Sequence, residues 1–64
     1  MFTLGIDIGS TACKSIILKD GKEIISRELV SLGTGTSGPA DVFHLVLKSA
    51  NLSRAEIARV MVTG

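Results

Sequence analysis

The sequence has no tryptophan or tyrosine, only two phenylalanines and a single cysteine, Cys13. One cysteine cannot form an internal disulfide, so neither a disulfide network nor a cysteine-rich metal cage can reinforce the fold. A composition with 45% hydrophobic residues and few aromatics predicts a thin, aliphatic core. Because a chain of this length buries only about 60% of the surface that its unfolded form exposes, we expect one small domain that needs a missing C-terminal continuation or an obligate partner.

The sequence also lacks an excess of charge of one sign and any long apolar run. Seven basic and six acidic side chains give a formal net charge of +1, and no basic run favours nucleic acid as a partner. No apolar run approaches the roughly 20 residues needed to cross a bilayer, and no signal-peptide pattern is present. We therefore expect a soluble protein of the reducing cytoplasm, without nucleic-acid or membrane partners.

Three strand-like segments open the chain, at residues 3–8, 12–19 and 22–32. The first two are short, apolar and rich in branched residues, which is typical of buried strands. Asp20-Gly21 separates the second from the third and is a strong hairpin signal, because both central turn residues tolerate positive φ. The third alternates imperfectly, which predicts a partly exposed strand with a bulge near Ile24 and Ile25.

A helix is expected from Pro39 to about Asn51, because proline fits the first turn, where its missing N–H would be unsatisfied anyway. Its polar positions include His44, which we expect to be solvated. The face expected to pack on the sheet comprises Ala40, Phe43, Val46, Leu47 and Ala50.

Ser53 and Glu56 match a capping box, which predicts a very short second helix. Residues 60–62 then form a fourth strand. Because this strand is reached through a helical crossover, we expect it to run parallel to one already in the sheet.

Residues 5–14 read Gly-Ile-Asp-Ile-Gly-Ser-Thr-Ala-Cys-Lys, an apolar strand, a tight turn and a second apolar strand. Gly9 lets the backbone approach a ligand closely, and successive N–H groups in such a turn can form a concave anion site. Ser10, Thr11 and Lys14 can add donors. A metal-bound triphosphate is therefore the first ligand to consider, although an ordinary β-turn would also need the glycine.

Together these features resemble the start of a ribonuclease-H-like, actin-like ATPase domain, an α/β fold with three antiparallel strands, a helix and a fourth, parallel strand. That superfamily includes sugar and acetate kinases, heat-shock chaperone ATPases and actin. Residues 4–14, 17–22 and 33–39 are also similar to the activators of 2-hydroxyacyl-CoA dehydratases, a family that includes the ATPase subunits of benzoyl-CoA reductase. The phosphate turn indicates only the superfamily, whereas residues 33–39 narrow the resemblance to the activators.

The resemblance implies that residues 1–64 are an incomplete, N-terminal part of an actin-like ATPase domain. In that family the protein is a homodimer with one [4Fe-4S] cluster between its subunits, and ATP hydrolysis drives a single low-potential electron into a dehydratase component. The cluster ligands lie beyond these residues, and Cys13 is expected to be a small buried filler. Catalysis by these 64 residues alone is not expected.

The resemblance also implies roles for residues of the turn. Asp7 would hold Mg²⁺ through water, and a carboxylate in an apolar strand is costly without a compensating partner; the alternative is a strand-end aspartate that bonds nearby amides. Gly9, Ser10 and Thr11 would donate to the phosphates of ATP. Lys14 would reach the phosphates or remain a surface lysine.

The loop before the helix is a further candidate, because a helix N-terminus directs free amides and a partial positive charge toward it. Its residues would line the nucleotide cleft or form a plain connector. They are Thr34, Gly35, Thr36 and Ser37.

Two other functions remain open at this point. A small-molecule kinase of the same superfamily would have a similar phosphate turn and a downstream catalytic aspartate. A non-catalytic, actin-like assembly protein would use ATP to switch conformation. A nuclease of this fold is disfavoured, because it needs several converging carboxylates for two metal ions and Asp7 stands alone.

Overall fold

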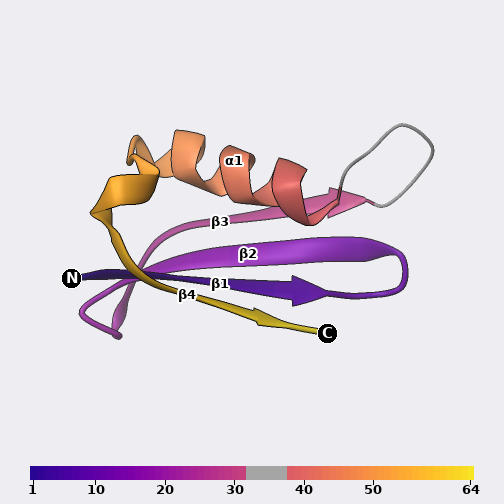
Figure 1. The fold of residues 1–64 in the computed structure, drawn as a ribbon, viewed down its shortest axis with the longest axis horizontal. Helices are drawn as coiled ribbons and strands as arrows, with labels where there is room; N and C mark the ends of the chain where they lie inside the picture. The colour runs from indigo at the N-terminus through magenta and orange to yellow at the C-terminus, as the bar shows by residue number, and fades with distance from the viewer. Residues whose placement is uncertain (32–37) are drawn as a thin grey trace.

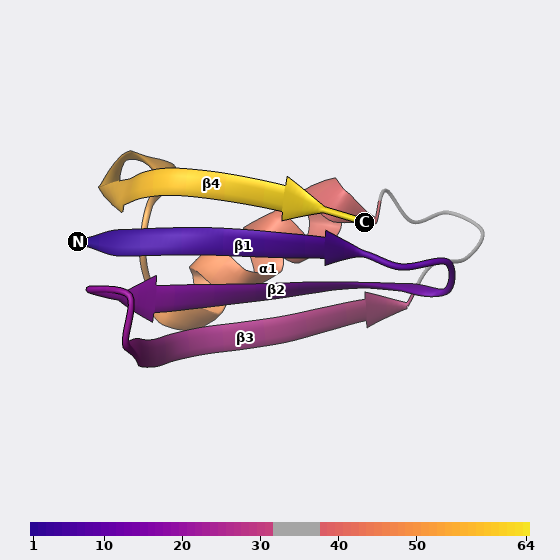
Figure 2. The same ribbon diagram turned by 90° about the horizontal axis from the view of Figure 1, so that it is seen from below.

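The computed structural model describes residues 1–31 and 38–64. They form one mixed sheet with the strand order β3-β2-β1-β4 and one helix packed on it (Figures 1 and 2). In chain order the elements are β1 (Phe2–Ile8), β2 (Ala12–Lys19), β3 (Glu23–Ser31), α1 (Pro39–Ala50), a 3₁₀ turn (Arg54–Glu56) and β4 (Ile57–Thr63). Among the described residues, none of the helical segments has the length and apolar character needed to span a bilayer.

The first three strands form an antiparallel meander, as the sequence predicts. Between β2 and β3, Asp20 and Gly21 both have positive φ, 55° and 71°, and the Lys22 N–H donates to the Lys19 carbonyl oxygen at 3.1 Å. This confirms the predicted turn with Asp20 and Gly21 at its centre. Lys22 follows them, because the ladder pairs Lys19 with Glu23. The predicted bulge is confirmed as well, because the pairing register of β2 with β3 skips Ile25.

The fourth strand is parallel to β1, which confirms the prediction from the helical crossover. It is longer than expected, since it begins at Ile57, whose side chain is buried. The short helix before it is a single 3₁₀ turn, and the Ser53 N–H donates to a Glu56 carboxylate oxygen at 2.7 Å. The fold thereby brings the C-terminal ends of β1 and β4 to the same edge of the sheet (Figure 2).

Helix α1 covers one face of the sheet, but not with the full set of residues expected (Figure 1). Val46 and Leu47 are buried, and Phe43 and Ala50 pack against the core, as predicted. Ala40 is exposed, and Val42, which was not assigned to this face, has no exposed surface. Successive residues of a helix are about 100° apart around its axis. The apolar stripe that packs on the sheet is centred between Val42 and Leu47, so Ala40, in the first turn, lies at the border of this stripe.

The core lies between α1 and the sheet. The Cys13 side chain is fully buried there, which confirms the expectation of a small filler. His44 is exposed on α1, also as predicted. The core residues, apart from Cys13, are Leu4, Ile6, Ile17, Val42, Val46, Leu47 and Ile57.

The face of the sheet opposite α1, here called the open face, has no helix of the described residues over it (Figures 1 and 2). Successive residues of a strand point to opposite faces. Since Leu4 and Ile6 face α1, the intervening Gly5 and the following Asp7 belong to the open face. The candidate site must therefore be sought at one end of this face.

Candidate functional site

The turn between β1 and β2 presents backbone donors to solvent. It is closed by the Gly9 N–H, which donates to the Ala12 carbonyl oxygen at 2.8 Å. Ser10 and Thr11 lie between them and are exposed, and their amides donate to no other described residue. Two neighbouring amides in such a turn are suited to an anion.

Glycine is needed at position 9 for space rather than for a left-handed conformation. Gly9 does not have a positive φ, but a Cβ placed on it would lie 3.0 Å from the Ala12 carbonyl oxygen. A side chain there would press on the group that closes the turn. This contact lies within the turn, and the outer side of Gly9 is exposed. The expected close approach of the Gly9 backbone to a ligand stays a prediction.

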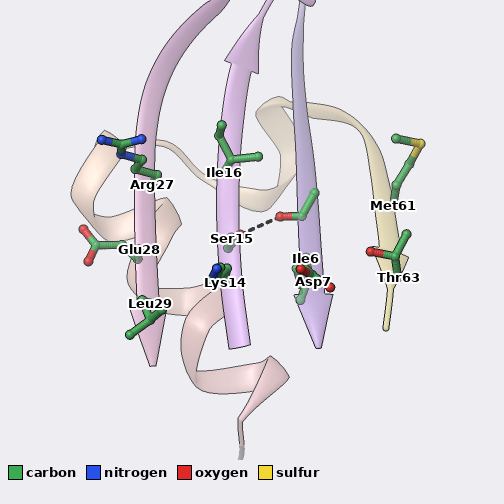
Figure 3. Close-up of a pocket in the computed structure, with 11 residues that line it drawn as sticks. Ile6, Asp7, Lys14, Ser15, Ile16, Arg27, Glu28, Leu29, Met61 and Thr63 are labelled. Atoms are coloured by element: carbon green, nitrogen blue, oxygen red, sulfur yellow. Dashed lines mark hydrogen bonds between the residues drawn. The ribbon is translucent and has the colours of Figure 1, made fainter. Parts of the chain in front are cut away.

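Asp7 and Lys14 stand opposite each other where β1 and β2 meet the turn. They are Cα partners in the antiparallel ladder, both side chains are exposed, and both line the open face (Figure 3). The neighbouring Ile6 and Ile8 point toward α1 instead. The apolar strand therefore does not bury the Asp7 carboxylate, so the expected cost of desolvation is absent and does not support a metal at this position.

An open pocket of about 780 Å³ lies over the open face, next to these two residues (Figure 3). The buried Ser15 hydroxyl links β2 to β1 there, because it donates to the Gly5 carbonyl oxygen at 3.0 Å. The turn residues Gly9, Ser10 and Thr11 do not line it, so the structure brings Asp7 and Lys14 into the pocket and leaves the turn at its rim. The lining residues are Gly5, Ile6, Asp7, Lys14, Ser15, Ile16, Arg27, Glu28, Leu29, Met61 and Thr63.

The sequence did not predict four polar residues that line this pocket, namely Ser15, Arg27, Glu28 and Thr63. Arg27 faces the pocket from β3 because it is the Cα partner of Ile16. Thr63 faces it from β4, as the Cα partner of Asp7. No local pattern could have identified either residue, since each is placed by pairing with a strand distant in the sequence.

Within the described residues, no group of three or more histidine, cysteine, aspartate or glutamate side chains comes together as a potential metal site. Asp7 can supply one carboxylate. That donor set fits Mg²⁺, which usually takes one or two protein carboxylates and completes its shell with water and substrate phosphates.

The shifted pKa of a carboxyl group is found at the end of the sheet opposite the β1–β2 turn (Figure 1). The Met1 ammonium donates to Asp20 at 2.8 Å, and this hydrogen bond and charge lower the pKa of the Asp20 carboxyl.

The predicted loop residues Thr34, Gly35, Thr36 and Ser37 lie outside the described residues, so their assignment stays a prediction.

The whole chain is similar to three curated proteins that carry related names. The (R)-2-hydroxyglutaryl-CoA dehydratase activating ATPase of Acidaminococcus fermentans is 55% identical over 64 residues. The 2-hydroxyisocaproyl-CoA dehydratase activator of Clostridioides difficile is 48% identical, and the activator of lactoyl-CoA dehydratase of Anaerotignum propionicum is 44% identical, each over the same length. All of this chain is aligned, but only 25%, 24% and 25% of these proteins, so it spans about a quarter of their length.

Solved structures of two of these relatives match the fold described above. Component A of the A. fermentans dehydratase superposes with a TM-score of 0.95 at 55% identity, over 100% of this chain and 25% of that one. The C. difficile activator, solved with bound ADPNP, gives a TM-score of 0.90 at 48% identity, over 100% and 24%. The four-stranded mixed sheet with its helix thus corresponds to the N-terminal part of an actin-like ATPase, which confirms the expected fold.

Residues 4–64 also match the BadF/BadG/BcrA/BcrD ATPase family. That range covers nearly the whole sequence, including the turn, most of β1 and all of β2, β3 and β4. The resemblance drawn from residues 4–14, 17–22 and 33–39 is thereby confirmed, and the chain belongs to the BadF/BadG/BcrA/BcrD ATPase family.

Proposed function

We propose that the full-length protein is an ATP-binding and ATP-hydrolysing activator of a 2-hydroxyacyl-CoA dehydratase. In this proposal residues 1–64 are the N-terminal part of its actin-like ATPase domain and supply the first phosphate-binding turn. The observation that carries the proposal is the similarity, from end to end, to three proteins that are each named for activating a dehydratase. The ADPNP bound in the C. difficile relative supports a nucleotide as the ligand.

The turn between β1 and β2 binds the phosphates in this proposal. The exposed amides and hydroxyls of Ser10 and Thr11 provide donors that no other described residue takes up. Gly9 keeps the turn tight without adding a side chain in front of them. Lys14, on the neighbouring strand, adds an ammonium group, a compact positive charge that attracts the phosphates.

Asp7 holds hydrated Mg²⁺ in this proposal, from the end of β1 next to the turn. The support is its exposure on the open face, because a hydrated ion needs a carboxylate that water can reach. When bound with ATP, the ion neutralises charge that develops on the phosphates during transfer. Lys14, as the Cα partner of Asp7, orients the same phosphates from the other side.

We further propose that ATP hydrolysis drives an electron into the dehydratase through a [4Fe-4S] cluster held by a cytoplasmic homodimer. The residues of this chain do not fit the cluster itself. Such clusters are bound by several cysteine thiolates, whereas Cys13 is the only cysteine and its side chain is fully buried beneath α1. The ligands must come from outside these 64 residues.

The test uses the full-length protein with Asp7→Asn, which removes the charge and keeps the size of the side chain. We expect ATP hydrolysis and dehydratase activation to fall by up to about 100-fold, because the carboxylate that holds the water shell of the ion is lost and such outer-shell partners are worth about 10- to 100-fold in metal affinity or activity. Circular dichroism should be unchanged, since Asp7 is exposed. Normal turnover of the Asp7→Asn protein would show that the metal is held elsewhere.

Lys14→Gln tests whether the Lys14 ammonium contacts the phosphates, and Lys22→Gln is its control. Both lysines are exposed, but Lys22 lies in the turn at the other end of β2. We expect Lys14→Gln alone to weaken binding of ADPNP, measured by titration calorimetry. Equal effects of the two substitutions would indicate that only net charge matters and that Lys14 makes no contact with the phosphates.

A further inference from the structure

Thr63 is the last residue of β4 and pairs with the residue proposed to hold the metal. Thr63 and Asp7 are Cα partners in the parallel β1–β4 pairing. Their side chains line the same pocket, and Figure 3 shows the Thr63 hydroxyl on the side of β4 that faces β1. Thr63 is exposed, and its hydroxyl bonds to no other described residue.

Close packing of the next residue holds Thr63 in this position. Gly64 has a φ of 154°, and a Cβ built on it would collide with the carbonyl oxygen of Ile8 and lie 2.8 Å from the Ile8 Cβ. The end of β4 is therefore pressed against the end of β1. Neighbouring strands lie about 4.8 Å apart, and a water that donates two hydrogen bonds of about 2.8 Å at its near-tetrahedral angle spans roughly 4.5 Å. One water molecule can therefore bridge the Thr63 hydroxyl and the Asp7 carboxylate.

We propose that Thr63 is a positioning residue of the metal–nucleotide site, and that its hydroxyl holds, together with Asp7, a water molecule of the Mg²⁺ shell. This rests on the function proposed above. A water bound to Mg²⁺ directs its lone pair at the ion and can only donate, so it would donate one hydrogen bond to the Asp7 carboxylate and the other to the Thr63 hydroxyl oxygen, and both of these groups accept. Thr63 thereby orients a water that Asp7 alone would leave free to rotate, and partners of this outer shell govern metal affinity.

The test compares Thr63→Val, which removes the hydroxyl and keeps the shape, with Thr63→Ser, which keeps the hydroxyl. In the full-length protein, ADPNP binding is measured by calorimetry over a series of Mg²⁺ concentrations and again in EDTA. We expect Thr63→Val to raise the Mg²⁺ concentration for half-maximal binding about 10-fold and to leave the affinity in EDTA unchanged. Thr63→Ser should behave as the unmodified protein, and Thr63→Ala replaces Thr63→Val if the latter does not fold.

A matched control moves the hydroxyl to the other face of β4. Val62 is the Cα partner of Ile6 and is 57% exposed. The double variant with Val62→Thr and Thr63→Val should therefore need the same raised Mg²⁺ concentration for half-maximal binding as Thr63→Val alone. An unchanged requirement in Thr63→Val, or an equal defect in Thr63→Ser, would overturn the proposal. If Asp7→Asn raises the Mg²⁺ concentration for half-maximal binding and Thr63→Val does not, only the role of Thr63 is wrong. If neither substitution raises it, the proposed metal site itself is wrong.

Discussion

Replacing Val42 by alanine tests which face of α1 packs on the sheet. Val42 has no exposed surface, so the change removes two buried methyl groups, worth about 0.8 kcal/mol each. The cavity left behind adds about 1 kcal/mol if the surroundings do not collapse into it. The higher helix propensity of alanine returns roughly 0.6 kcal/mol, and we expect a net loss of about 2 kcal/mol of local stability.

Amide hydrogen exchange of the full-length protein, followed by mass spectrometry, measures this loss where it occurs. Peptides from β1 and β2 report the free energy of local opening, and about 2 kcal/mol corresponds to roughly 30-fold faster exchange. Ala40→Gln is the control, because Ala40 is exposed and surface substitutions stay within about 0.5 kcal/mol. If Ala40→Gln accelerates exchange as much as Val42→Ala, the packed face of α1 is the one expected from the sequence, and our assignment is wrong.

Three further substitutions or modifications test separate features. Gly64→Ala should separate the end of β4 from Ile8 and speed amide exchange there; unchanged protection would show that this packing is not required. Gly21→Val should cost about 1–2 kcal/mol more than Gly21→Asn, because φ is +71° while a Cβ would meet nothing within 4 Å; equal denaturation midpoints would contradict this. Acetylating the Met1 amino group should raise the pKa of Asp20 toward its ordinary value of 3.8, measured by carbon NMR titration, and an unchanged pKa would refute the ion pair.

The sign of the Asp20 effect follows from the direction of its shift. The Met1 ammonium lowers the pKa of the folded-state carboxyl, so the ion pair contributes its full stabilisation above the ordinary value of 3.8. That contribution is lost as the pH falls through the lowered pKa. Both partners are largely exposed, 70% and 64%, so salt should weaken the effect.

Local chemistry allowed much of the fold to be read from the sequence. Asp20-Gly21 specified its own turn, because few residues other than glycine, asparagine and aspartate adopt positive φ. Alternating and continuous apolar runs marked β1 and β2, and a helical crossover required β4 to be parallel to a strand already present. The turn at Gly9 was identified in the same way, from residues that are adjacent in the chain.

Tertiary structure decided which residues meet. The border of an apolar helical stripe is ambiguous to within one residue, so only contact with the sheet could separate Val42 from Ala40. The exposure of Asp7 depended on which face of the sheet α1 covers, and that face cannot be deduced from the strand alone. Thr63 came beside Asp7 through a register between strands more than 50 residues apart in the sequence. A pattern within one segment contains no information about such a register, because it is set by the packing of the whole sheet.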